Sequence, residues 1–413
     1  MITTTQNNFK NFFKSSSWGW CLFDFANSIP AVIGGIYFAK WFTEDVGASS
    51  IAFNLLFFVS AIVIILSGKW VGKRIDTDGY KFWIKLSSGI TFIAIFSLFL
   101  TSQFLPKVVI LPISFLFFVI FLFGYQVSRI CHNVYLRGVI PEEIQSKMSG
   151  LGTAANWAGS ITGIGLTIPV IMVNSGTLGR ELTFLVASIG YGILTPISLY
   201  FMFLSKPNSN LTLLAQNQEK ITWKSLLSSI GILLLIYLLL FDVMATVQRN
   251  LPLYLSQIFK MPDNTQALGF LLILFSAMVG GFLAAKSVQY KNSKAWLIRS
   301  SLLLAFSIML ITIHNNVTLW IAFITAGLSY GIMESSIRVN FMGTFSPVKA
   351  GENFGILAVV ERTSGVIGPL IWIIPFTIFS DNNNSYIFSM YLMALISFVA
   401  FLLLFCIKKV KHL

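Results

Sequence analysis

The second half of this 413-residue sequence repeats the first half at an offset of 205 residues. The repeat is carried by polar residues and glycines that stand in segments otherwise built of Phe, Leu, Ile, Val and Gly. A charged group at the centre of a bilayer costs about 2.5–3.5 kcal/mol on insertion scales, so such groups are rare unless they are used. Their recurrence in both halves is typical of membrane transporters with parallel repeats and a site between the repeats. The matched pairs are Tyr125 and Tyr330, Arg129 and Glu334, Asn133 and Arg338, Gly150 and Gly355, Asn156 and Glu361, and Gly163 and Gly368.

Composition and hydropathy define the fold class. Only 10% of the residues are charged, whereas soluble domains carry about 25%. Apolar segments recur that are long enough to cross a hydrocarbon core of about 30 Å. We therefore predict an all-α, polytopic membrane protein with twelve transmembrane helices in two six-helix pseudo-repeats. The helices are predicted at 18–42, 49–72, 82–104, 108–136, 147–173, 183–204, 223–247, 265–286, 295–313, 317–342, 352–379 and 385–407.

The polar stretches between these segments set the predicted domain boundaries. We expect a cytoplasmic tail at 1–17, a six-helix bundle at 18–204, a cytoplasmic linker at 205–222, a second bundle at 223–407 and a tail at 408–413. The polar start of the chain is not followed by a short apolar core with a small-residue cleavage site. The first helix is therefore predicted to be retained and not to be a signal peptide.

The net charge of +13 raises the question of a nucleic-acid partner. With the N-terminus placed in the cytoplasm, 20 of the 28 Lys and Arg residues fall on the cytoplasmic side, 4 fall outside and 4 lie within helices. This asymmetry is typical of membrane orientation. We therefore predict a multi-pass protein of the cell (inner) membrane, with both termini in the cytoplasm, the lipid bilayer as its surroundings and no nucleic-acid partner.

Motifs for an enzyme are missing from the sequence. It contains no Gly-rich phosphate loop, no zinc pattern and no nucleophile elbow. Its three cysteines have neither disulfide nor metal-ligand spacing. We predict that the chain is not an enzyme and has neither a cofactor nor a metal site.

The first helix carries a polar face. Asp24, Asn27 and Ser28 are spaced i, i+3, i+4 and therefore share one side of the helix. An aspartate at this depth is costly, and an asparagine can complete the coordination of a cation. The pattern predicts a cation or proton site, or a hydrogen-bonding site for a solute. The alternative is an aspartate that caps or packs against a neighbouring helix.

The fourth helix carries a second polar stripe. Gln126, Arg129 and Asn133 line one face, and Arg137 continues it towards the cytoplasmic surface. Arg129 is deep and requires a partner, a cavity or both. His132 lies beside the stripe, either as a proton relay or, as is more common for a lone histidine near a helix end, in a structural role.

Helices seven and eleven contain further ionisable groups. Asp242, Thr246 and Arg249 share one face of helix seven, and Asp242 corresponds to the first-helix aspartate by helix order. Helix eleven has adjacent Glu361 and Arg362, which point about 100° apart and are not expected to pair closely. Glu361 is a second-rank candidate for carrying a proton.

Helix ten has Glu334 and Arg338 at i, i+4, with the glutamate first, which is the favourable order for an ion pair. Such a pair is either a self-neutralised unit that lowers the cost of insertion or a switch whose partners exchange between states. The sequence leaves both interpretations open.

Four segments resemble one branch of a known superfamily. The first helix reads Trp-Cys-Leu-Phe-Asp-Phe-Ala-Asn-Ser at 20–28, and 141–152 contains Pro-Glu-Glu followed by Ser-Gly-x-Gly. Phe-Asp at 241–242 precedes Thr246, and Ser-Gly-x-x-Gly-Pro occupies 364–369. These segments resemble the vacuole-effluxer-like branch of the major facilitator superfamily, which includes fungal autophagy-related vacuolar amino-acid exporters. The resemblance implies a twelve-helix transporter fold with a central cavity.

The chain departs from that branch in three places. Val243 replaces the glycine after the helix-seven aspartate, and Glu334 replaces a glutamine. The Ser-Arg-Ser that follows in helix ten is Ser-Ile-Arg at 336–338. The changes fall in the implied cavity, so the branch's substrate is not carried over to this chain.

A further pattern resembles the superfamily's cytoplasmic loop between helices two and three. It consists of Gly72, Asp76, Gly79 and Lys81. In that fold the aspartate can sit at a helix N-terminus and hold one conformational state, which implies a gating role here. The alternative is a plain solvated loop. In the second half Ala285 stands where the aspartate would be, so only one half has the full pattern.

Together these features predict a secondary active transporter that moves a small polar solute by alternating access. Because the predicted site carries both signs of charge, the leading solute is an amino acid or similar metabolite. Arg129 and Arg338 present planar forks suited to a carboxylate, and the coupling ion is H+ or, second, Na+. One alternative is a sugar–cation symporter of the glycoside–pentoside type, which Asp24 and the segment 41–47 resemble. The other is a transporter-fold receptor or scaffold that moves nothing.

Overall fold

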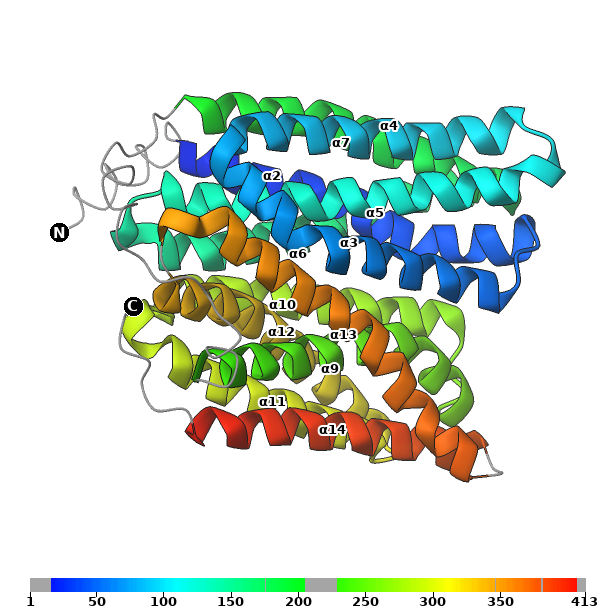
Figure 1. The fold of residues 1–413 in the computed structure, drawn as a ribbon. Coiled ribbons are helices and arrows are strands. Elements are labelled where there is room, and N and C mark those ends of the chain that lie inside the picture. The colour runs from blue at the N-terminus through cyan, green and yellow to red at the C-terminus, as the bar shows by residue number, and fades with distance from the viewer. Residues whose placement is uncertain (1–15, 175, 205–228, 346, 380–381, 407–413) are drawn as a thin grey trace, which may run out of the picture. The chain divides into compact units, whose positions relative to one another are not determined.

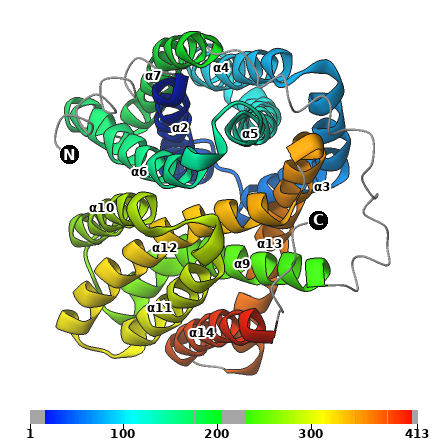
Figure 2. The same cartoon turned by 90° about the vertical axis from the view of Figure 1, so that its left-hand side faces the viewer.

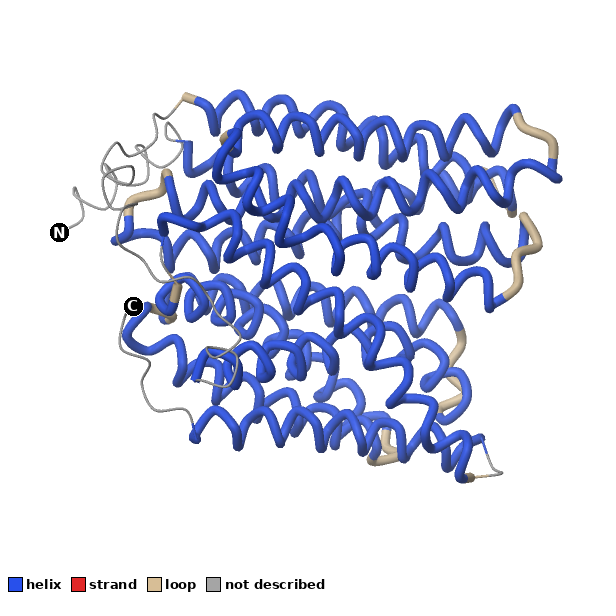
Figure 3. The backbone as a smooth tube through the Cα atoms, in the orientation of Figure 1, coloured by secondary structure: helices blue, strands red, loops and turns tan. Residues whose placement is uncertain are grey.

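The computed structural model describes residues 16–174, 176–204, 229–345, 347–379 and 382–406. Within these ranges the regular structure is entirely helical (Figure 3), and twelve helical segments are long and apolar enough to cross a membrane. The predicted fold class is thereby confirmed. The predicted linker 205–222 and nearly all of the two predicted tails lie outside the described residues.

Within each half of the described chain the helices follow one another with connections of a few residues (Figure 1). Their bounds are α2 (Ser16–Ile33), η1 (Gly34–Phe38), η2 (Trp41–Asp45), α3 (Ser50–Asp78), α4 (Tyr80–Phe104), α5 (Lys107–Gly138), α6 (Glu142–Val173), α7 (Thr177–Phe203), α9 (Ser229–Ile258), α10 (Asp263–Ser287), η5 (Tyr290–Asn292), α11 (Ser293–Thr312), α12 (Asn316–Thr344), η6 (Pro347–Lys349), α13 (Ala350–Ile378) and α14 (Asn382–Cys406).

Several helices extend beyond the predicted bounds, and in two of them the added turns end at a glycine. α3 runs to Asp78 and not to residue 72, and α7 begins at Thr177 and not at 183. In each case one glycine with positive φ makes the turn: Gly79 has φ +91° and Gly176 has φ +77°. Because glycine adopts this conformation without steric cost, a single residue suffices and the flanking turns stay helical.

The first membrane span, Ser17–Asp45, changes its winding along its length. Pro30 lies inside α2 and lacks the N–H that a helix interior requires. One turn later the chain is a π-helix from Gly34, and it is π-helical again from Trp41. Such wide turns are rare and often occur at functional sites. The sequence predicted an ordinary helix ending at residue 42.

The chain divides into two compact units that exchange short segments. The first comprises residues 1–142, 155–210 and 349–358, and the second comprises 143–154, 211–348 and 359–413. In the first unit α2 packs beside α7, and α4 packs beside both α5 and α7 (Figure 2). In the second unit α12 lies against α10 and α11, while α14 contacts α11 and α9. The first turns of α6 and of α13 thus belong to a different unit from the rest of their helix.

Repeat-related glycines make equivalent contacts in the two halves of the sequence. Gly163 of α6 packs closely on Ile29 of α2. Its repeat partner Gly368 of α13 packs closely on Thr246 of α9, the helix that corresponds to α2. Small residues let helix backbones approach at such points. The two glycines therefore contact corresponding helices, although their partners Ile29 and Thr246 are 217 residues apart and not 205.

Gly159 of α6 gives a direct test of this packing. We expect Gly159→Ala to destabilise the chain by about 1–3 kcal/mol, because the added methyl group would collide with the Phe25 carbonyl oxygen and the Ser28 hydroxyl of α2. Gly165→Ala on the same helix is the matched control, since open space surrounds Gly165. Thermal unfolding in detergent measures the difference. Equal midpoints for the two variants would contradict the prediction.

Candidate functional site

Asp24 is paired with a histidine across two helices of the first unit. His132 Nδ1 of α5 lies 3.7 Å from Asp24 Oδ1 of α2, and both residues are buried. The rings of Trp20 and His132 stack with centroids 4.2 Å apart and planes inclined by 8°. The sequence singled out both residues of the pair but did not predict their contact. The available signal was Trp20, which stands one turn before Asp24 on the same helix face.

The proton positions on His132 follow from its partners. The Trp20 carbonyl oxygen lies 2.8 Å from His132 Nε2, and a carbonyl only accepts. Nε2 therefore carries a hydrogen, which leaves Nδ1 facing Asp24 as the nitrogen that can gain or lose a proton. In return, Trp20 Nε1 donates to the His132 carbonyl oxygen at 2.8 Å. The two hydrogen bonds fix the imidazole in place.

The other predicted residues of the first unit differ in burial. Asn27 is buried, and its Oδ1 accepts from Ser128 Oγ of α5 at 3.4 Å. Gln126 is buried too, whereas Arg129 and Asn133 are half-buried. The Arg129 guanidinium lies 5.9 Å from the centroid of the Tyr125 ring, within the range of a cation–π contact.

An ionic cluster at the other end of the first span was not predicted as a site. Arg180 of α7 binds Glu44 at 2.6 Å and Asp45 at 2.7 Å. Glu181 accepts from Gln103 at 2.7 Å and from Trp41 at 3.3 Å. Local spacing gives no signal for these contacts, because the partners are 78 to 140 residues apart in sequence.

In the second unit the predicted helix-ten ion pair is present. Arg338 Nη2 lies 3.8 Å from Glu334 Oε1, and Arg338 also donates to the Ser149 carbonyl oxygen of α6 at 3.4 Å. Glu361 and Arg362, which were not expected to pair closely, have charged atoms 3.9 Å apart. This distance is at the outer limit of an ion pair and agrees with that expectation.

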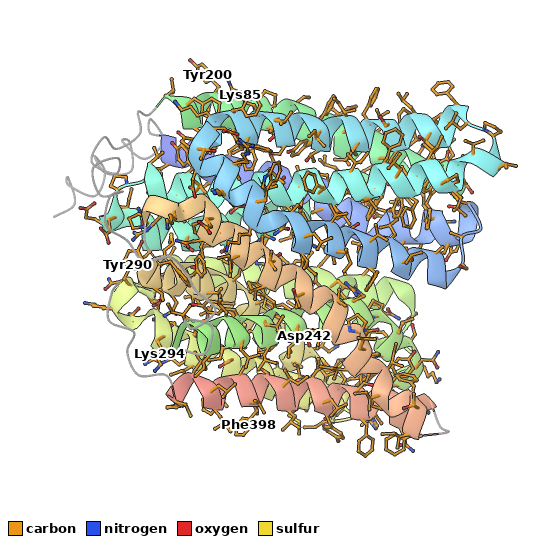
Figure 4. The ribbon with its side chains drawn as sticks, in the orientation of Figure 1. Lys85, Tyr200, Asp242, Tyr290, Lys294 and Phe398 are labelled. Carbon is orange, nitrogen blue, oxygen red and sulfur yellow. The ribbon has the colours of Figure 1, made fainter. Side chains whose placement is uncertain are left out.

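Asp242 and Thr246 are both buried near the middle of α9, where Figure 4 labels Asp242. Neither oxygen of Asp242 nor the Thr246 hydroxyl has a hydrogen-bond partner among the described residues. Gly368 of α13 faces both side chains. These are the two most deeply buried polar candidates of the helix-seven face predicted from sequence.

The predicted gating motif lies in a helix and not in a loop. Gly72 and Asp76 are in the last turns of α3, and Gly79 alone separates α3 from α4. The loop prediction was wrong because Gly79 turns the chain by itself. Lys81 is in the first turn of α4, and its Nζ lies 5.4 Å from the centroid of the Phe203 ring.

Asp76 caps the start of α13. Its Oδ1 accepts from the Gly351 N–H at 2.7 Å, and its Oδ2 accepts from the Glu352 N–H at 2.9 Å. A carboxylate is stabilised at a helix N-terminus because the first N–H groups have no partner within the helix. Gly72 lies against Gly351, and a side chain there would collide with the Gly351 carbonyl.

We expect Asp76→Asn to speed amide hydrogen exchange at Gly351 and Glu352 by about 10-fold, because hydrogen bonds to a charged acceptor are worth about 1.5–3 kcal/mol and partial exposure of Asp76 favours the low end. Asp78→Asn is the control, since Asp78 accepts from Thr77 and Trp83 instead. Mass spectrometry of the peptide that begins at Ala350 reads the exchange. Unchanged exchange in Asp76→Asn would show that the cap does not hold α13.

Comparison with known families identifies the fold family. The sequence profile of the Major Facilitator Superfamily matches residues 17–369. The chain belongs to the Major Facilitator Superfamily. Membership places this superfamily protein among transporters of small solutes and not among enzymes. Curated proteins provide no significant sequence match, and the vacuole-effluxer-like branch stays a prediction.

Solved structures of the superfamily share the fold of this chain. The proton:xylose symporter XylE bound to 6-bromo-6-deoxy-D-glucose has a TM-score of 0.72 at 15% identity, with 95% of this chain and 94% of that chain covered. FucP in the outward conformation has a TM-score of 0.73 at 12% identity, with 95% and 98% covered. The human organic anion transporter MFSD10 (TETRAN) has a TM-score of 0.68 at 14% identity, with 94% and 97% covered. At these identities the similarity concerns the fold alone.

Proposed function

We propose that this superfamily member is a proton-coupled secondary transporter that moves a small zwitterionic solute, an amino acid or similar metabolite, by alternating access. We place it in the vacuole-effluxer-like branch, in the cell (inner) membrane, with both termini in the cytoplasm. The six-helix bundles at 18–204 and 223–407 are its proposed repeats. Sodium is the second choice of coupling ion.

The burial of paired ionisable groups in transmembrane helices carries the proposal. Asp24 faces His132 at 3.7 Å, and Glu334 faces Arg338 at 3.8 Å, all within apolar segments. Buried ion pairs are weak contributors to stability, since desolvation offsets their attraction. Each unit nevertheless retains such a pair at membrane depth, which is the place where ionisable groups mark solute and proton pathways.

Each candidate residue has a proposed role. Asp24 with Asn27 is the leading cation or proton site, and Asp242 with Thr246 is a second acidic site. Arg129 and Arg338 bind the carboxylate of the solute, because a guanidinium offers two parallel donors to it. The description of MFSD10 as an organic anion transporter is consistent with a carboxylate-bearing solute. Gln126, Asn133 and Glu361 complete the polar set, while Glu334 neutralises Arg338 between transport steps.

The close contact of α3 with the start of α13 is the proposed gate. Asp76 holds two N–H groups of α13, and Gly72 lets the backbones touch. Gly79 provides the turn, and Lys81 lies just beyond it. Opening requires that Asp76 release α13, so its two hydrogen bonds set the cost of leaving this state.

A sugar–cation symporter is the second candidate. Asp24 and the segment 41–47 resemble the glycoside–pentoside group, and XylE, whose fold is similar, is described as a proton:xylose symporter. Arginine pairs suit a carboxylate better than an uncharged sugar, so we rank this candidate lower.

Proteoliposomes that contain a pH dye test the proposal. The purified chain is challenged with amino acids, sugars and carboxylates, and solute-induced proton movement is recorded. We expect a response to amino acids or related carboxylates and none to sugars. A response to sugars alone favours the symporter candidate, and movement only with sodium excludes proton coupling. If folded, inserted protein gives no proton movement with any solute, the result supports a receptor or scaffold that does not transport.

A further inference from the structure

Asp242 is an acidic residue whose side chain is buried in the protein interior. It is 1% exposed, and it lies near the middle of α9 (Figure 4), far from both ends of the helix. Neither carboxylate oxygen meets a hydrogen-bond donor among the residues that the structure describes. The Gly368 N–H faces the carboxylate, but its geometry falls short of a hydrogen bond. An ionised carboxylate left in this way costs several kcal/mol, and such groups usually neutralise instead.

Thr246 is turned towards the same point. Most buried Ser and Thr hydroxyls of this chain donate to a carbonyl three or four residues earlier, as Thr91 and Thr153 do. The Thr246 hydroxyl, which is also buried, makes no such bond. A Cβ on Gly368 would collide with Thr246 Oγ1 and lie 2.5 Å from Asp242 Oδ1. The two side-chain oxygens therefore converge on the point that a Cβ on Gly368 would occupy.

The charged groups around this point form no close ion pair with Asp242. Arg249, two turns later on α9, attracts the Asp242 carboxylate electrostatically, and adjacent Glu361 and Arg362 lie on α13 about two turns before Gly368. α14, which packs on α9, has tyrosines and a cysteine as its only ionisable side chains. Among the described residues Asp242 has no cation within ion-pair distance. Asp24, in contrast, faces a histidine, His132, at 3.7 Å.

We propose that Asp242 is the residue that holds the transported proton, with the Thr246 hydroxyl beside it and the Gly368 backbone closing the site. This inference rests on the proposed proton coupling. It ranks Asp242 ahead of Asp24 as the proton site, whereas the proposed function ranks Asp24 first. The protonated carboxyl carries no charge that needs solvation, and Thr246 Oγ1 is the nearby oxygen that can accept its hydrogen when the two side chains approach. Two carboxylate oxygens and one hydroxyl are enough to bind a proton. Three oxygen ligands are fewer than a metal cation usually coordinates.

Release of the proton then depends on α13. While Gly368 covers Asp242, water does not reach the carboxyl group, and the neutral acid is the favoured form. When α13 moves away from α9, water solvates the carboxylate and accepts the proton. The contact between Gly368 and Asp242 thereby links protonation to the position of one helix.

Infrared spectroscopy of the purified full-length chain tests the site without any solute. A protonated carboxyl group in a dry site gives a carbonyl-stretch band that an ionised carboxylate lacks. We expect this band at neutral pH in the wild type and in Asp24→Asn, and its loss in Asp242→Asn. The asparagine variant should fold, since it matches the neutral acid in size and charge. A band that survives in Asp242→Asn, or that is missing in the wild type, overturns the proposal.

Two neighbouring glycines provide a matched pair of variants. We expect Gly368→Ala to shift or remove the band, because its methyl group displaces Thr246 and Asp242. Gly365→Ala, where open space surrounds the added methyl group, should leave the band unchanged. Loss of the wild-type band on exchanging potassium for sodium at constant pH would overturn the assignment by identifying a sodium site. Because the band is read without transport, a failed solute panel and a failed proton site remain distinguishable.

Discussion

Replacing Asp24 with asparagine is expected to abolish ion-coupled transport while the chain stays folded. Asparagine matches aspartate in size, so the stack of Trp20 on His132 and the two hydrogen bonds between them remain. What the variant loses is the negative charge that faces His132 Nδ1 at 3.7 Å. Without it, neither a cation nor the amino group of a zwitterion is balanced at this depth.

Uptake driven by a pH gradient into proteoliposomes measures this effect, with the solute that the panel identifies. Asp78→Asn is the control, because Asp78 is an exposed aspartate at the end of α3. We expect uptake near background in Asp24→Asn and near wild type in the control, with similar melting temperatures. Undiminished uptake in Asp24→Asn would exclude Asp24 from coupling.

The second large effect is expected on stability. Arg338→Met removes one partner of a buried ion pair and the donor to the Ser149 carbonyl oxygen. Breaking a buried pair in this way costs about 3–5 kcal/mol, because the remaining charge stays buried after its ion-pair partner is removed. The group that loses Arg338 is Glu334, whose side chain is only 13% exposed.

A double variant separates the stranded charge from the lost packing. We expect Glu334→Gln with Arg338→Met to be more stable than Arg338→Met alone, since it removes both charges together. Arg299→Met is the control, because Arg299 is exposed and packs over Trp296 at 5.0 Å. Unfolding in detergent measures all variants. If Arg338→Met alone were as stable as the double variant, the charge of Glu334 without Arg338 would not destabilise the chain.

Hydropathy and residue spacing were sufficient to predict the helices and the polar residues that share one face of a helix. Asp24 and Asn27 were placed on one face of α2 by their spacing, and both are buried there. The i, i+4 order of Glu334 and Arg338 predicted a pair that the structure contains. These features are local, because helical geometry alone relates the residues.

Contacts between different helices could not be predicted from the sequence. No periodicity tells which residue of α5 lies opposite Asp24, so the His132 contact had to come from the structure. The same holds for Arg180 with Glu44, which are 136 residues apart. Asp76 was expected in a loop, because nothing in the pattern shows that Gly79 alone can make the turn. The roles of all these residues stay predictions.

The exchange of helix ends between the two units has a consequence for how the chain holds together. Residues 143–154 of α6 pack in the unit that contains most of the second half, and 349–358 of α13 pack in the other. Each unit is therefore completed by a piece of its sister, as in a domain-swapped dimer. The first half expressed by itself would lack the α13 segment that packs on Gly72, and the second half would lack the α6 segment that packs on Ala285. Each half of the sequence thus contributes a short helical segment to the compact unit that the other half mainly forms.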